Sequence, residues 1–176
     1  MSSIAATTSA GRQSPSRSLT LTAIFLLLAM AATVGTALGF EHFGGYMPCK
    51  LCLEQRIPYY IGVPLMAVAV AASLAGAPRW LVRVLLAAGG GLMLWGLYMG
   101  VFHSGVEWHW WAGPTDCGAV SAPAEEGRSV LDMLDDVIPP SCDAATLRVL
   151  GLSFAGWNAV VSLVLAAVAF RGALKR

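Results

Sequence analysis

The chain has 176 residues, of which 57% are hydrophobic and only 12% are charged. An average soluble domain has about a quarter of its residues charged, so this composition excludes an ordinary water-soluble globular protein. The formal net charge of +1 gives no reason to expect a nucleic-acid partner. The composition therefore predicts an integral membrane protein.

The chain begins with a polar stretch, 1–18, that is rich in Ser, Thr and Ala and is predicted to be a disordered tail. A long apolar segment follows at 19–40. This segment could instead be the core of a cleaved signal peptide, because Arg12 and Arg17 precede it and small residues end it. It is longer than the roughly 7 to 15 apolar residues of a signal core, which favours a membrane-spanning helix.

Three further apolar segments lie at 57–77, 80–102 and 149–170. Each of the four segments has close to the roughly 20 residues that a helix needs to cross about 30 Å of hydrocarbon. None alternates between apolar and polar residues, as the strand of a membrane barrel would. The predicted fold is an all-α membrane protein, a bundle of four transmembrane helices joined on one side by the two loops 41–56 and 103–148.

Basic residues are unevenly divided between the two sides of this predicted bundle. The side that holds the termini and the connector between the second and third segments has seven of them, and the side that holds the two loops has four. The seven are Arg12, Arg17, Arg79, Arg83, Arg171, Lys175 and Arg176; the four are Lys50, Arg56, Arg128 and Arg148. By the positive-inside rule, both termini, including the basic tail 171–176, are predicted to be cytoplasmic. All four cysteines then lie on the opposite side, where disulfides persist.

The second loop contains a short amphipathic pattern at 130–138, with apolar residues on one helical face and aspartates opposite. Ser129 is a suitable N-cap and Pro139 would end the helix. We expect a short helix on the membrane surface between Cys117 and Cys142. The alternative is that this helix packs on the bundle.

Cys49 and Cys52 form a CxxC motif, which occurs in redox sites, zinc sites and haem attachment sites. Haem attachment is excluded because Leu53, and not His, follows the motif. Zinc is disfavoured because Cys117 and Cys142 are too widely spaced to form a second close pair, so no metal is predicted. Static disulfides remain an alternative, although a two-residue spacer at a helix start favours an exchangeable, low-pKa thiol.

Two cations accompany the motif. Lys50 and the positive end of the following helix are expected to stabilise a thiolate. Arg56 comes four residues after Cys52, on the same helical face and one turn deeper in the membrane. An arginine at that depth is costly, which favours a functional role. The alternative is that Arg56 snorkels to lipid headgroups or pairs with Glu54 or Glu41.

This combination resembles the DsbB family of bacterial disulfide-generating membrane proteins. The shared features are four helices, a first-loop CxxC with an arginine four residues later, and a widely spaced second-loop cysteine pair. Further matches are HSGVE at 103–107 and LGLSFAGW at 150–157. The resemblance covers 19 to about 170. The vitamin K epoxide reductase family is similar, but its CxxC follows its loop cysteines along the chain.

The resemblance implies a thiol:quinone oxidoreductase of the bacterial inner membrane. In that family, a periplasmic thioredoxin-like oxidase of the DsbA type delivers electrons to the second-loop pair, here Cys117 and Cys142. The electrons pass to Cys49 and Cys52 and then to a membrane quinone of the ubiquinone or menaquinone type. By the same resemblance, the partner attacks Cys117, Cys52 faces the quinone, and Arg56 helps to bind it.

The HSGVE match also assigns His103 and Glu107 to the quinone site. His103 is suited to stabilise charge on the quinone oxygens or to shuttle protons, and the alternative is an ordinary interfacial histidine. Other functions remain open at this point: a paralogue with one dedicated client, or a non-enzymatic scaffold with static disulfides or a metal-binding assembly role. Neither non-enzymatic role requires Lys50 and Arg56 where they stand.

Overall fold

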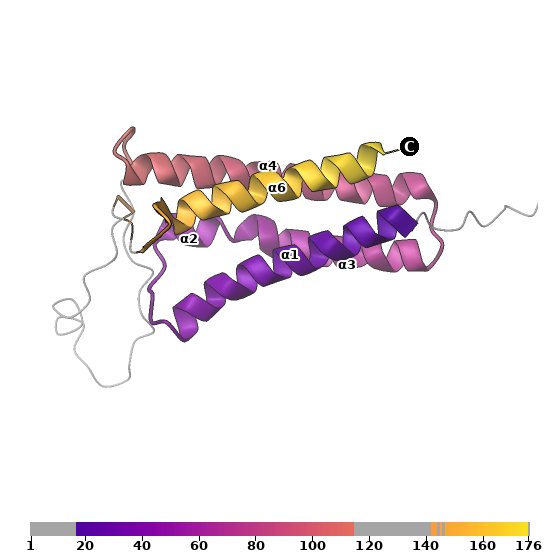
Figure 1. Cartoon of the computed structure of the whole chain (residues 1–176), viewed down its shortest axis with the longest axis horizontal. Coiled ribbons are helices and arrows are strands. Elements are labelled where there is room, and N and C mark those ends of the chain that lie inside the picture. The colour runs from indigo at the N-terminus through magenta and orange to yellow at the C-terminus, as the bar shows by residue number, and fades with distance from the viewer. Residues whose placement is uncertain (1–16, 115–141, 144, 146, 176) are drawn as a thin grey trace, which may run out of the picture.

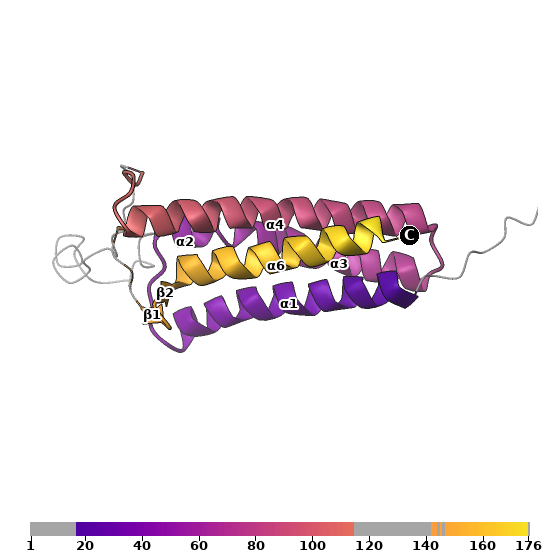
Figure 2. The ribbon, with the colours of Figure 1, turned by 45° about the horizontal axis from the view of Figure 1, so that its top comes forward.

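The computed structural model describes residues 17–114, 142, 143, 145 and 147–175. Within these residues the chain forms a bundle of long helices with one two-stranded hairpin (Figures 1 and 2). The helices are α1 (Arg17–His42), α2 (Lys50–Glu54), α3 (Ile57–Leu74), α4 (Arg79–Glu107) and α6 (Phe154–Leu174). The strands are β1 (Arg148–Val149) and β2 (Leu152–Ser153), which pair antiparallel.

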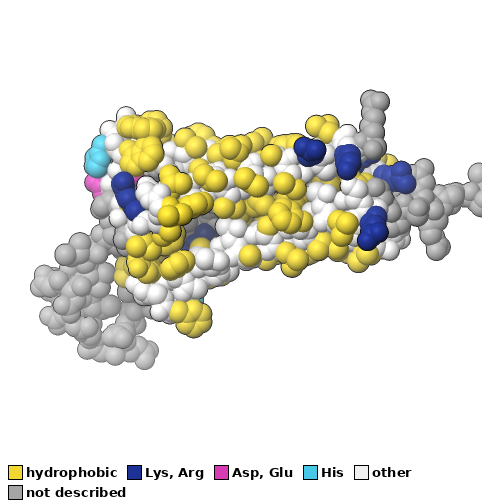
Figure 3. Space-filling view, viewed as in Figure 1, with side chains coloured by type: hydrophobic (Ala, Val, Ile, Leu, Met, Phe, Trp, Pro, Cys, Tyr) yellow, Lys and Arg dark blue, Asp and Glu magenta, His cyan; other side chains and the backbone are white. Residues whose placement is uncertain are grey.

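Four helical stretches of the described chain are long and apolar enough to cross a membrane: α1, α2 together with α3, α4, and α6. Their outward-facing side chains form a hydrophobic surface between the two ends of the bundle (Figure 3). The all-α, four-span bundle predicted from the sequence is thereby confirmed. The predicted surface helix at 130–138 lies outside the described residues, as does most of the polar tail.

The bundle has two chemically different ends. The start of α1 and the end of α6 lie together at one end, and the segment that leads into α2 lies at the other (Figure 1). Basic side chains gather at the end where α1 starts and α6 finishes (Figure 3). This asymmetry matches the charge bias seen in the sequence, and the orientation across the membrane stays a prediction.

The second span is divided into α2 and α3 by a break at Gln55 and Arg56. Pro58 stands in the first turn of α3 and has no backbone N–H to continue a hydrogen-bond ladder from α2. The break makes α2 a separate short turn with Cys49 as its N-cap. It therefore sets the directions of the side chains around the CxxC motif.

Helices α4 and α6 approach closely through small residues. A Cβ atom added at Gly100 would lie 2.8 Å from the backbone nitrogen of Ala159, and one added at Gly96 would lie 2.9 Å from Oγ of Ser162. Small residues allow such backbone contact between membrane helices, where van der Waals packing drives association. The close contact fixes the face of α6 that carries Asn158 against α4.

The helix ends differ from the sequence prediction in two places that affect the site. α4 continues to Glu107, so His103 and Glu107 lie on a helix and not in a loop. α6 begins only at Phe154, because Ser153 caps it by accepting a hydrogen bond from the N–H of Gly156 at 3.2 Å. The preceding hairpin turns through Leu150 and Gly151, which both have positive φ, and this turn cannot be helical.

Replacing Gly100 by Ala is expected to lower the free energy of unfolding by about 1–3 kcal/mol, because the new methyl group would overlap the α6 backbone. Gly91→Ala is the matched control, since a Cβ there meets nothing within 4 Å and gains the same helix propensity. Unfolding in mixed detergent micelles would measure both. Equal stability of the two variants would contradict the close packing of α4 on α6.

Candidate redox site

Cys49 and Cys52 lie side by side as free thiols. Their Sγ atoms are 3.2 Å apart, and the backbone N–H of Cys52 donates to Cys49 Sγ at 3.4 Å. A disulfide has an S–S distance of about 2.05 Å, so a small movement would close the pair. Cys49 is only 6% exposed and lies at the start of α2. The pair is therefore placed for reversible disulfide formation.

The surroundings of Cys49 favour its thiolate. The pKa of Cys49 is lowered below its ordinary value of 9.0, chiefly by a hydrogen bond from the Cys52 thiol. Burial opposes this shift, while hydrogen bonds from His103 and from the N–H of Cys52 support it. Cys49 is thus the thiol of the pair set up to carry negative charge.

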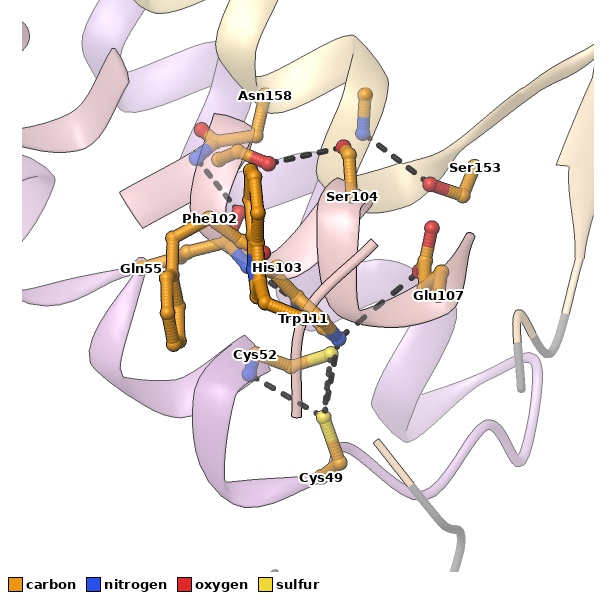
Figure 4. A network of polar contacts seen from close by, with 12 residues as sticks. Cys49, Cys52, Gln55, Phe102, His103, Ser104, Glu107, Trp111, Ser153 and Asn158 are labelled. Carbon is orange, nitrogen blue, oxygen red and sulfur yellow. Dashed lines mark hydrogen bonds and ion pairs between the residues drawn. The ribbon is translucent and has the colours of Figure 1, made fainter. Parts of the chain in front are cut away.

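His103 approaches Cys49 from α4 (Figure 4). Its Nε2 atom lies 3.7 Å from Cys49 Sγ and 3.9 Å from Oε1 of Glu107. Its Nδ1 atom lies 2.6 Å from the side-chain nitrogen of Gln55. Glu107 is also buried, and its Oε2 atom has no hydrogen-bond partner among the described residues. His103 therefore joins the cysteine pair to a buried network of polar groups.

Cys142 belongs to the same buried region as Cys49. It is 3% exposed, is disulfide-bonded, and packs in one cluster with Cys49, Leu51 and Val106. Cys117 lies outside the described residues. The structure thus brings a cysteine of the second loop together with the first cysteine of the CxxC motif.

Cys52 packs against the cluster of Cys49 and Cys142 and, unlike Cys49, also lines a cavity of about 410 Å³. The cavity lies between α1, α3 and α6, next to the segment that leads into α2. Three aromatic rings form part of its wall, with centroids 5.1 to 6.3 Å apart in edge-to-face contacts: Phe40, Tyr46 and Phe154. Such a site suits a flat, mainly apolar ligand.

Arg56 is the basic residue of the cavity wall. It pairs with Glu41, which also lines the cavity, and its side chain is 12% exposed. The sequence offered this ion pair as an alternative to a ligand-binding role, and the structure places both residues where a ligand would contact them. A guanidinium has five N–H donors, more than the ion pair uses.

The remaining predicted site residues, His103 and Glu107, do not line this cavity. The direction of α4 turns them toward Cys49 instead. Two cavity residues, Gln55 and Asn158, were not singled out from the sequence. Asn158 could have been, because a polar amide inside the apolar segment 149–170 is itself a signal of function.

The two thiols and His103 also have the spacing of a possible metal site. Their ligand atoms all lie within 4.8 Å of one another. Two thiolates and one imidazole are ligands that zinc accepts in proteins. The sequence assigned His103 to the quinone site that Cys52 faces, and did not predict it as a metal ligand.

The chain was compared with known protein families, curated proteins and solved structures. The family model described as Disulfide bond formation protein DsbB matches residues 19–171. No curated protein and no solved structure matched the chain. The matched range includes every residue of the cysteine pair, the cavity and the His103 network.

The lowered pKa of Cys49 predicts that its thiolate persists as the pH falls from 9.0 through neutrality, and is lost only when the pH falls through the lowered value. Alkylation of reduced protein at a series of pH values, followed by peptide mass spectrometry, would measure this. His103→Leu should move the Cys49 transition to higher pH, because it removes a hydrogen bond to the thiolate. His42→Leu, at an exposed histidine, is the control; equal titrations in both variants would contradict a role for His103.

Proposed function

This chain belongs to the DsbB family, whose members act in disulfide bond formation and transfer electrons to quinones, and we propose that it is a protein-dithiol:quinone oxidoreductase. One observation carries the proposal: the two thiols of one CxxC motif face different surroundings. Cys49 packs with the loop cysteine Cys142, and Cys52 lines the apolar cavity that also contains Arg56. A motif arranged in this way can receive electrons on one side and release them on the other.

The first exchange takes place at the second loop. A reduced thioredoxin-like protein of the DsbA type attacks the disulfide that we propose between Cys117 and Cys142, through a mixed disulfide with Cys117. The partner leaves oxidised, and the two loop cysteines are left as a dithiol. This exchange needs no contact between the partner and the membrane-embedded part of the site.

The second exchange takes place at Cys49. The reduced Cys142 attacks the Cys49 sulfur of an oxidised CxxC pair, and Cys52 leaves as a thiol. Attack of Cys117 on Cys142 then re-forms the loop disulfide and releases Cys49. A thiol of lowered pKa leaves more readily, so the contacts that stabilise the Cys49 thiolate favour this step.

The final acceptor is proposed to be a quinone in the cavity beside Cys52. A quinone accepts two electrons and two protons when the cysteine pair returns to a disulfide. The flat apolar ring of a quinone would pack against the aromatic wall of the cavity. The guanidinium of Arg56 would donate hydrogen bonds to a quinone carbonyl oxygen, which gains negative charge on reduction. Arg56 is the residue that we assign to that oxygen. His103 and Glu107 are assigned to the Cys49 side.

The protein is proposed to lie in the bacterial inner membrane with its cysteine end in the periplasm. The basic end of the bundle supports a cytoplasmic position for both described chain ends. This orientation gives the loop cysteines access to a periplasmic partner. It also places the cavity at the depth of the membrane interface, where a lipid-soluble quinone can enter.

Purified full-length protein supplied with a reduced thioredoxin-like donor should reduce added quinone, and Cys52→Ser should abolish this activity because no CxxC disulfide can re-form. Arg56→Gln should raise the KM for quinone by roughly tenfold, the loss expected for one charge-assisted hydrogen bond. Arg83→Gln is the matched control, since Arg83 contacts the carbonyl of Lys175 and does not line the cavity. Unchanged quinone reduction in Cys52→Ser would refute the proposed function.

A further inference from the structure

A chain of hydrogen bonds connects three helices to the cysteine pair (Figure 4). It starts on α6, where the Asn158 amide nitrogen lies 3.4 Å from the backbone oxygen of Gly96 and 2.8 Å from the side-chain oxygen of Gln55. The oxygen of Asn158 accepts a hydrogen bond from the Tyr59 hydroxyl at 2.7 Å. The chain continues from Gln55 to His103 and ends at Cys49.

The donor and acceptor of every hydrogen bond in this series follow from the first bond, between Asn158 and the backbone oxygen of Gly96. A backbone carbonyl can only accept, so Asn158 presents its NH2 group to Gly96 and its oxygen to Tyr59. The same NH2 group donates to the oxygen of Gln55, which leaves the Gln55 nitrogen pointing at His103. An amide nitrogen only donates, so Nδ1 of His103 must be the acceptor. The proton of the neutral ring is then on Nε2.

A proton on Nε2 matches what surrounds that atom. The groups that face it are Sγ of Cys49 at 3.7 Å and Oε1 of Glu107 at 3.9 Å, both acceptors when ionised. Cys52, the other titratable group beside the ring, contacts Cys49. A ring with its proton on Nδ1 would place a lone pair against the thiolate. Protonated Nε2 also has no lone pair for a metal ion, which weighs against a metal site at these three side chains.

We infer that Gln55, held in orientation by Asn158, is a positioning residue that fixes the Nε2–H tautomer of His103 and so keeps a donor directed at the Cys49 thiolate. The effect of this tautomer on electron transfer rests on the proposed function, because Cys49 acts as leaving group and disulfide partner only in that reaction. The tautomer itself does not depend on that function. Partner groups commonly set the tautomer of a functional histidine in this way.

Burial explains why the direction is maintained. Gln55 is 6% exposed and His103 is 3% exposed, so neither side chain has ready access to water as a substitute partner. Reversing the Gln55 amide would put its NH2 group against that of Asn158, and reversing both would lose the bond to Gly96. A buried polar group left unpaired is costly, and the cost favours a single arrangement.

The tautomer can be read directly by nitrogen-15 NMR of histidine-labelled full-length protein, with His42→Gln and His109→Gln so that only His103 reports. The unaltered network should show the proton on Nε2. Gln55→Glu, whose carboxylate accepts from Nδ1–H, should show a protonated Nδ1. Ser162→Ala, which removes a buried hydroxyl bonded to Tyr59 but not to the amides, should leave the tautomer unchanged.

Gln55→Met keeps the shape of the side chain and removes the donor. It should give a mixture of tautomers and weaken the Cys49 thiolate roughly fivefold, seen as a shift of its alkylation profile to higher pH. A proton on Nδ1 in the unaltered network, or an unchanged tautomer and Cys49 profile in Gln55→Met, would overturn the inference. If the His103 tautomer and the Cys49 alkylation profile are as expected but the wild-type protein does not reduce quinone, only the proposed function is refuted.

Discussion

The break between α2 and α3 is the constraint on which the geometry of the site depends. Pro58 separates a five-residue turn from the long helix below it, and that turn starts at Cys49. Because the turn is short and capped by its own cysteine, the two thiols are adjacent while their outer sides face different neighbours. One continuous helix would have offered no such separate turn. The helix break therefore affects the surroundings of the pair, because Gln55 beside His103 and Arg56 at the cavity both lie in it.

The polar groups around the pair are arranged on two sides. Arg56 and Glu41 neutralise each other at the cavity, so a cation can lie there without an uncompensated charge in the membrane. His103 lies on the side of Cys49 and α4, and the amides of Gln55 and Asn158, which also line the cavity, are hydrogen-bonded to it in series. Stabilisation of the thiolate and stabilisation of charge on an acceptor are thus assigned to different residues.

Much of this architecture could be predicted from the sequence, because segment length and apolarity determine a membrane helix with few alternatives. The CxxC spacing and Arg56 were also recognisable, since their chemistry depends on neighbours along one helix. The surroundings of His103 were not, because its partners Cys49 and Gln55 are far away in the chain. The hairpin before α6 was missed because Val149 and Leu150 are as apolar as the helix that follows.

The proposed path depends on Cys49 packing with the loop cysteine Cys142 while Cys52 lines the cavity. The most direct measurement is peptide mapping of disulfides in oxidised Cys52→Ser and Cys49→Ser proteins. In Cys52→Ser, the unpaired Cys49 should be found joined to a loop cysteine, with Cys142 the expected partner because the two pack in one buried cluster. In Cys49→Ser, Cys52 should remain unjoined to the loop. Equal joining of Cys52 to Cys142 would contradict the account.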